Sequence, residues 1–272
     1  EYALLDGEKP EVAQAIFEQY MPRFAGDILP QQEIGRALSL ADKLDNLAAT
    51  FLRGLIPTGS QDPFALRRQT IGAVNILIDG KIHWDIRRGI EAALALLPGD
   101  EETKKTVLSQ IEDFFRQRIK AIMLDEGIAY DIIDAVLAGP VDDIYALFLK
   151  ARSMAESQLK GEAELRQAVT RLANITKGKA GGKVDPSLFT EDVEKKLQDA
   201  FEAVSAKALP LFASYEYGKA LPALKELTAP INDYLDNVMV MVDDEAVKNN
   251  RISQLLATLA LFNTWGDFSK LV

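Results

Sequence analysis

The residue types that usually perform catalysis are scarce in this sequence. Cysteine is absent and histidine occurs once, at His83. Without cysteine, the chain can form no disulfide, thiol nucleophile or Cys-ligated zinc or iron–sulfur site. A His-pair metal motif or a Ser-His-Asp triad would depend on His83 alone, which has no other candidate ligand beside it. We therefore predict a packing or surface histidine, no catalytic residue and no metal site.

Two carboxylates, Asp42 and Asp45, lie close to the apolar stripe of a helix predicted over residues 31–53. They could be remnants of a metal site. Buried carboxylates, however, usually have a hydrogen-bonding or cationic partner within the protein. We favour a structural role, in which they pair with Arg36, with Arg53 or with nearby backbone donors.

The basic residues are more informative, because the chain as a whole is acidic. With a net charge of -10 and a pI near 4.8, it should bind nucleic acid only through a local basic face. The densest basic neighbourhood surrounds residues 177–183, here called the lysine loop, and contains Arg166, Arg171, Asn174, Lys177, Lys179 and Lys183. Arg171 and Asn174 share a helix face. This face would combine a guanidinium that can bind phosphate with an amide that can contact a base edge. A solvated linker is the alternative for the loop.

A second candidate group joins aromatic and basic side chains. Arg116 and Arg118 directly follow Phe114 and Phe115. An exposed ring, for which Phe115 is the candidate, could stack on an unpaired base while the arginines hold phosphate. The alternative is a basic, solvated face that covers an aromatic core.

Arg67 and Arg68 stand at the start of a predicted helix, where cations oppose the helix dipole. Such a position favours a nearby anion. A phosphate would suit the guanidinium geometry, and so would a carboxylate such as Asp62, Asp42 or Asp45. We therefore include both arginines among the candidate nucleic-acid contacts.

Helices must position all these residues. Apolar residues recur at three- and four-residue spacing along nearly the whole chain, and no run alternates with period two. We predict an all-α protein, with Asp62 capping a helix that has Pro63 at its first position and another helix starting at Asp185-Pro186. The predicted helices are 11–20, 31–53, 64–78, 84–97, 101–125, 130–137, 141–157, 162–176, 186–207, 217–227, 230–241 and 245–262.

Length and composition indicate two globular domains. The chain has 272 residues, of which 48% are hydrophobic and 26% charged, and Pro98-Gly99-Asp100 is the strongest internal break. No secretion signal is visible, and no stretch approaches the roughly 18 apolar residues of a membrane span. The chain starts without Met, which suggests a piece of a longer protein.

Several strings resemble the β subunit of bacterial heterotetrameric glycyl-tRNA synthetase, in order and at similar spacing. The strongest are Tyr20-Met-Pro-Arg-Phe-Ala-Gly-Asp27, Ala37-Leu-Ser-Leu-Ala-Asp-Lys-Leu-Asp45 and Pro57-Thr-Gly-Ser-Gln-Asp-Pro-Phe-Ala-Leu-Arg-Arg68. Arg171-Leu-Ala-Asn-Ile175 and Asp236-Asn-Val-Met-Val-Met-Val-Asp-Asp244 continue the resemblance, which covers essentially the whole chain.

The resemblance implies an HD-like helical domain followed by an α-helical-bundle anticodon-binding domain similar to that of arginyl-tRNA synthetase. Residues 1–97 would be the end of the HD-like domain and residues 98–272 the anticodon binder. Asp42 would match the last aspartate of the HD pattern, but a chain with one histidine cannot complete that metal site. The catalytic core, with its ATP and Mg, belongs to the α subunit, so this chain is expected to hold no cofactor and to be inactive alone.

From this resemblance we expect the chain to recognise the anticodon region of glycine tRNA for glycylation by the α subunit. Its partners would be glycine tRNA, the α subunit and the rest of β, with no role for a membrane or DNA, in the bacterial cytoplasm or a plastid. Two alternatives are an HD-type metal phosphohydrolase, disfavoured by the shortage of histidine, and a structural domain for α/β assembly.

Overall fold

A computed structural model describes residues 1–272, apart from the side chain of Gln158. The chain divides into two compact units. Unit 1 comprises Glu1–Glu126 with Pro140–Phe148, and unit 2 comprises Gly127–Gly139 with Leu149–Val272. Among the described residues, β-type pairing is limited to the isolated bridges Thr58–Gln61 and Asp85–Asp143. The predicted all-α class is therefore confirmed.

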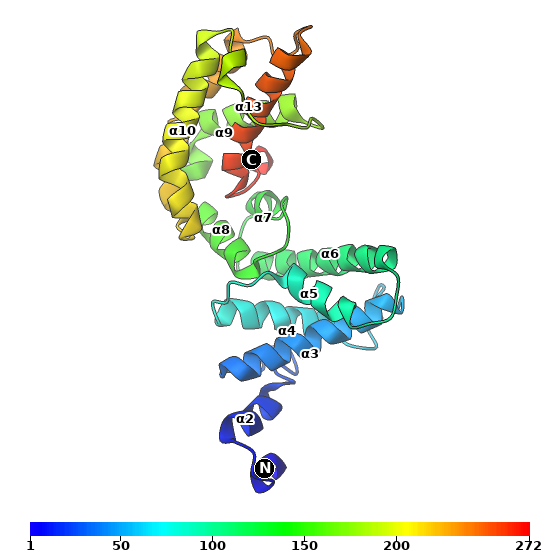
Figure 1. The fold of residues 1–272 in the computed structure, drawn as a ribbon. Coiled ribbons are helices and arrows are strands. Elements are labelled where there is room, and N and C mark those ends of the chain that lie inside the picture. The colour runs from blue at the N-terminus through cyan, green and yellow to red at the C-terminus, as the bar shows by residue number, and fades with distance from the viewer. The chain divides into compact units, whose positions relative to one another are not determined.

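Unit 1 is built around one central helix. Its helices are α1 (Tyr2–Leu5), α2 (Pro10–Glu18), α3 (Glu33–Leu52), α4 (Leu66–Asp79), α5 (Ile86–Ala95), α6 (Glu101–Asp125) and the start of α8 (Ile144–Glu156). The α3 helix packs against α2, α4, α5 and α6, the last three of which lie beside it in Figure 1. Their facing sides bury Leu47, Ile76, Ile111 and Phe115 completely, and this core fixes the positions of α3 and α4.

Unit 2 contains the rest of α8 and the remaining helices. These are α7 (Tyr130–Val136), α9 (Ala163–Thr176), α10 (Asp192–Ala213), α11 (Leu221–Lys225), α12 (Thr228–Asn237) and α13 (Glu245–Asn263), with short 3-10 turns η1 (Gln158–Gly161), η2 (Pro186–Leu188), η3 (Tyr217–Ala220) and η4 (Phe268–Lys270). Both α9 and α10 pack against α12 and α13, and η4 packs against α9. Trp265 and Phe268 are fully buried with their rings edge to face.

Most predicted helices are present, but several start or end elsewhere. The α8 helix starts at Ile144 instead of residue 141, and the helix predicted over 217–227 is the turn η3 followed by α11. The α4 helix begins at Leu66, after Ala65 at φ 54°, so Pro63 lies outside it. Asp62 still caps the helix, because its carboxylate accepts the backbone N–H groups of Leu66 (2.8 Å) and Arg67 (3.0 Å).

The helix predicted from Pro186 is instead the short turn η2 followed by α10. Glu191 and Glu194 form a reciprocal capping box at the true start of α10. Gly127 adopts φ +80° just after α6, the left-handed conformation that favours glycine at the C-terminal end of a helix.

The Pro98-Gly99 break separates α5 from α6. Both helices belong to unit 1, since α6 packs against α3, α4 and α5. The compact units thus change at Glu126, whereas the family's domain boundary after residue 97 stays a prediction. None of the described helices is long and apolar enough to cross a membrane.

Candidate nucleic-acid interface

The lysine loop is held in place by α13. The Gly182 N–H donates to Ser253 Oγ at 2.8 Å, and the Asp185 N–H donates to Asn250 Oδ1 at 2.7 Å. The Asn250 amide donates back to the Asp185 carbonyl at 3.0 Å. At Gly181 a Cβ would lie 2.9 Å from the side chain of Leu256, so glycine allows the loop to approach the helix this closely. The loop is therefore a segment docked on α13.

The polar residues of α9 and the lysine loop differ in how many hydrogen bonds they make within the protein. Arg166 donates to the Leu271 carbonyl (3.2 Å) and to the Lys160 carbonyl (3.1 Å), holding the C-terminal segment. Arg171 donates to Asn232 (2.9 Å) and to Asp236 (2.5 Å) on α12. Both arginines thus join parts of unit 2.

Three candidate residues of α9 and the lysine loop are exposed to solvent, namely Asn174, Lys177 and Lys183. Lys179 is half-buried, with its ammonium 3.5 Å from the sulfur of Met241. The exposed members of the predicted cluster therefore lie at the end of α9 and in the docked loop, and their contact with nucleic acid stays a prediction.

The aromatic group on α6 is not arranged as the sequence predicted. Phe115 is fully buried and Phe114 is 6% exposed, so neither ring can stack on a base in this conformation. The Arg118 guanidinium lies 3.9 Å from the Phe114 ring centroid and donates to the Phe114 carbonyl. Arg116 has Asp113 nearby, at 3.8 Å. The prediction of an exposed Phe115 is wrong, and the alternative of basic residues over an aromatic core describes what is present.

Arg67 and Arg68 have different surroundings at the start of α4. Arg67 Nη2 donates to the Gly59 carbonyl at 2.7 Å and so braces the turn that contains Asp62. Burial and the neighbouring charge of Arg67 together lower the pKa of Arg118 from its usual value, with Asp62 opposing the shift. Arg68 is exposed, donates to the Arg23 carbonyl at 3.1 Å and lines a cavity between α3 and α4.

The carboxylates of α3 do not have the partners expected for them. Asp42 accepts hydrogen bonds from Gln19 (3.1 Å) and Asn46 (3.4 Å), and Asp45 is exposed. Arg36 pairs with Asp79 at 3.2 Å instead. The predicted pairing with Arg36 or Arg53 is wrong, because the buried side of α3 lies one position further along the helix than Asp42.

That buried side carries Lys43, a residue the sequence analysis missed. Lys43 is 3% exposed, and its ammonium donates to the Met21 carbonyl (2.9 Å) and to Ser39 Oγ (2.7 Å). Burial lowers the pKa of Lys43 to about 8, with Asp42 opposing the shift. Its four-residue spacing from Ser39, on a stripe that continues to Leu47, was the available signal.

His83 behaves as predicted. Its ring packs 4.9 Å from that of Tyr145, and Nδ1 lies 2.7 Å from a carboxylate oxygen of Asp143. This confirms the prediction of a packing or surface histidine. Over the part of the chain that the structure describes, no three His, Asp or Glu side chains gather closely enough to hold a metal ion.

Unit 2 also contains a buried ion pair, Glu194–Arg251. Arg251 is 4% exposed and donates to Glu194, Thr190 Oγ1 and the Met239 carbonyl. Glu194 Oε2 accepts the backbone N–H groups of Thr190 and Glu191, each at 2.8 Å. Burial alone would raise the pKa of Glu194, but the bond from Arg251 and these N–H groups outweigh it and hold the pKa below its usual range.

These features define an all-helical chain of two units with a docked basic loop on the second. A family model described as glycyl-tRNA synthetase beta subunit matches residues 1–138, and one described as DALR anticodon binding domain matches residues 165–266. The chain belongs to the glycyl-tRNA synthetase β-subunit family, which confirms the resemblance seen in its motifs.

Its relatives agree with this family. The glycine–tRNA ligase beta subunit of Clostridioides difficile is 42% identical over 100% of this chain and 40% of the relative. That of Desulforamulus reducens is 40% identical over 100% of this chain and 40% of the relative. That of Halothermothrix orenii is 39% identical over 94% of this chain and 37% of the relative. The chain thus spans about 40% of the length of the first two relatives.

Proposed function

We propose that this chain is the tRNA-binding part of a glycyl-tRNA synthetase β subunit and that it recognises the anticodon region of glycine tRNA. The contact surface is the end of α9 together with the lysine loop. Glycyl transfer, with its ATP and Mg, takes place at the α-subunit site. The chain performs no chemical step, and works with the α subunit and the rest of β in the bacterial cytoplasm.

The docking of the lysine loop is the observation that carries this proposal. A loop fixed to α13 loses little conformational freedom when it binds, so its lysines need not be ordered by the RNA. Lys177 and Lys183 offer charge to phosphates, which positions an RNA. Asn174, one turn before Lys177, offers an amide to an unpaired base, the part of RNA in which sequence is usually recognised.

Neutralising the exposed lysines of the loop tests the proposal. We expect the double variant Lys177→Gln/Lys183→Gln to bind glycine tRNA about tenfold more weakly, and its log–log salt slope to fall by about 0.7–0.9 for each phosphate that the variant no longer neutralises. Filter binding at several salt concentrations measures both quantities.

The matched control removes the same charge elsewhere in unit 2. Lys195 and Lys196 are exposed on α10, so Lys195→Gln/Lys196→Gln should change the affinity little. An unchanged affinity and slope in the loop variant, or an equal weakening in both variants, would contradict the proposed surface. The first of these results would favour a domain used only for assembly.

A further inference from the structure

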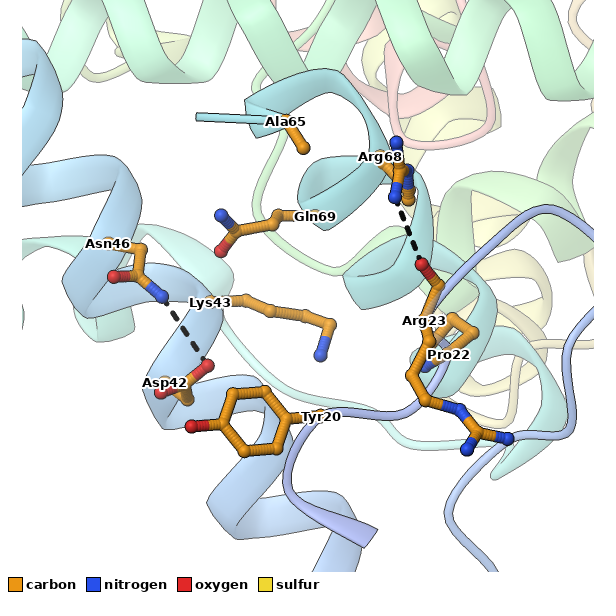
Figure 2. Close-up of a pocket in the computed structure, with 9 residues that line it drawn as sticks. All are labelled: Tyr20, Pro22, Arg23, Asp42, Lys43, Asn46, Ala65, Arg68 and Gln69. Atoms are coloured by element: carbon orange, nitrogen blue, oxygen red, sulfur yellow. Dashed lines mark hydrogen bonds between the residues drawn. The ribbon is translucent and has the colours of Figure 1, made fainter. Parts of the chain in front are cut away.

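A cavity of about 250 Å³ lies in unit 1 between the segment after α2, the α3 helix and the start of α4 (Figure 2). We call it the Lys43 cavity. Lys43 and Gln69 line its interior, and Tyr20 and Arg68 line it with more exposed side chains. Its volume far exceeds the roughly 30 Å³ that one water molecule occupies in the liquid. It can therefore hold a small organic group.

The cavity contains a hydrogen-bond donor that the protein does not use. The Lys43 ammonium has three N–H groups, of which Met21 and Ser39 accept two. The third has no partner among the described residues. Figure 2 shows the nitrogen directed into the space between α3 and the segment containing Pro22.

An unused acceptor faces the same space. Gln69 Nε2 donates to the Phe64 carbonyl at 3.0 Å, and this bond fixes which way the amide is turned. Gln69 Oε1 is buried and has no hydrogen-bond partner within the described chain. In Figure 2 its oxygen is the end of the amide nearer to Lys43. Burying such groups unsatisfied is unfavourable, so a ligand that satisfies both would recover that cost.

The surrounding chain is shaped to keep Lys43 there. A Cβ on Gly72 of α4 would lie 3.1 Å from Lys43 Cε and 3.1 Å from Pro22 Cγ, so glycine leaves room for the lysine stem. Asp42, the neighbouring carboxylate, accepts hydrogen bonds from Gln19 and Asn46. The ammonium therefore has no hydrogen-bonded counter-ion of its own.

We propose that the Lys43 cavity binds an unpaired nucleotide of RNA. An acceptor on the base edge faces Lys43 Nζ, a donor on the same edge faces Gln69 Oε1, and Arg68 contacts the phosphate. Tyr20, a residue that is 68% exposed, stacks on the base. The choice of RNA rests on the proposed function, whereas the nucleotide chemistry rests on the cavity.

The pair of unused groups favours a base over a simple anion. Neighbouring donors and acceptors are what the edges of nucleobases present. An inorganic phosphate would satisfy Lys43 and could donate an O–H to Gln69 Oε1, but it has no planar face on which Tyr20 could stack. Arg68 uses one guanidinium nitrogen on the Arg23 carbonyl, which leaves its other N–H groups for a phosphate next to the base.

Binding of small probes to the whole chain tests the cavity itself. The probes are the four ribonucleoside 5′-monophosphates and inorganic phosphate, titrated by calorimetry. We expect at least one monophosphate to bind, and to bind at least tenfold more weakly to Lys43→Met and to Tyr20→Ala. Tyr20 is exposed, so its variant stays informative should Lys43→Met fold poorly. The control Tyr2→Ala removes another exposed ring of unit 1 and should change nothing.

Three results would overturn the proposal: no monophosphate binds, inorganic phosphate binds as well as the best monophosphate, or both cavity variants bind like the unaltered protein. Glycine tRNA then identifies the source of the nucleotide. If monophosphates bind but Lys43→Met leaves the tRNA affinity unchanged, the ligand is a free nucleotide and the RNA assignment is wrong.

The lysine-loop variants keep this test separate from that of the proposed function. If the loop variants bind tRNA normally and the cavity binds monophosphates, the proposed lysine-loop interface is contradicted and the Lys43 cavity is retained as a binding site. If only the loop variants bind tRNA more weakly and no monophosphate binds, the proposal for the Lys43 cavity is contradicted and the proposed function is retained.

Discussion

Lys43 in unit 1 and Arg251 in unit 2 are buried to nearly the same extent, with 3% and 4% of their surfaces exposed. Their surroundings differ. Arg251 faces the fully buried carboxylate of Glu194 at 3.0 Å and also donates to Thr190 and to a backbone carbonyl. Lys43 bonds only neutral oxygens and keeps one N–H unused among the described residues.

The difference shows what burial of a charge does and does not indicate. A buried cation with its counter-ion and hydrogen bonds in place is part of the structure, and it leaves nothing for a ligand to add. A buried cation without a counter-ion lowers stability, and a ligand can supply what is missing. Unused hydrogen-bonding capacity, rather than burial, therefore distinguishes the Lys43 cavity from the Glu194–Arg251 pair.

Removing Arg251 should have the largest effect on stability. Arg251→Met leaves the Glu194 carboxylate buried without its cation, and we expect unit 2 to lose about 3–5 kcal/mol of unfolding free energy. The buried Trp265 reports on unit 2, so urea unfolding followed by its fluorescence in a Trp84→Phe background measures the change.

The control for this prediction removes the charge of both partners. Glu194→Gln/Arg251→Met contains no unpaired ion and should be more stable than Arg251→Met alone. If the single variant is as stable as the unaltered protein, Arg251 is no more integral to unit 2 than an exposed residue, and the contrast with Lys43 fails.

Removing Lys43 should have the opposite effect on stability, raising the unfolding free energy of unit 1. The pKa of Lys43 is about 8 in the folded chain, against 10.5 for an ordinary lysine. Between these values the unfolded chain binds more protons, so the stability of unit 1 rises as the pH rises through this window. Below about pH 8 both states are protonated, and the full penalty, of about 3 kcal/mol, is present. At pH 7 Lys43→Met should therefore stabilise unit 1 by up to that amount.

The pH dependence supplies the control for Lys43. The advantage of Lys43→Met should shrink between pH 8 and 10, whereas Lys43→Arg keeps its charge and should not recover stability over this range. Urea unfolding of unit 1, followed by Trp84 in a Trp265→Phe background, measures both. A Lys43→Met variant less stable than the original at pH 7 would mean that the ammonium stabilises the fold.

The sequence was sufficient for the features that depend on local chemistry. Helical periodicity located both ends of α3, α6 and α9 to within two residues. The start of α4 was missed because Pro63 suits a first helical position, whereas Ala65 at φ 54° delays the helix.

The candidate site could be predicted only in part, because its partners are distant in sequence. Arg171 was expected to be available for phosphate, but Asp236, which it contacts, lies 65 positions away. Lys43 was missed because its acceptor, the Met21 carbonyl, belongs to a separate segment 22 positions before it. The lysine loop was recognised by composition, but its docking depends on Asn250 and Ser253 of α13.

The smallest effect on stability is expected at Arg171, which completes the comparison within unit 2. The Arg171–Asp236 pair joins α9 to α12, but its side chains are 42% and 61% exposed. Exposed pairs contribute about 0.2–1 kcal/mol, so Arg171→Ala should change the Trp265 unfolding curve several times less than Arg251→Met. A destabilisation above about 2 kcal/mol would show that the difference in exposure between Arg171 and Arg251 does not determine how much each stabilises unit 2.

The same pair decides whether Arg171 also contacts RNA. The arginine must leave Asp236 to reach a phosphate, so the pair competes with the ligand. Asp236→Ala should then strengthen glycine-tRNA binding, because it releases the guanidinium and removes a nearby negative charge. Arg171→Ala/Asp236→Ala separates these causes: it keeps the stronger binding if only removal of the carboxylate matters, and binds no more tightly than the unaltered protein if Arg171 holds the phosphate.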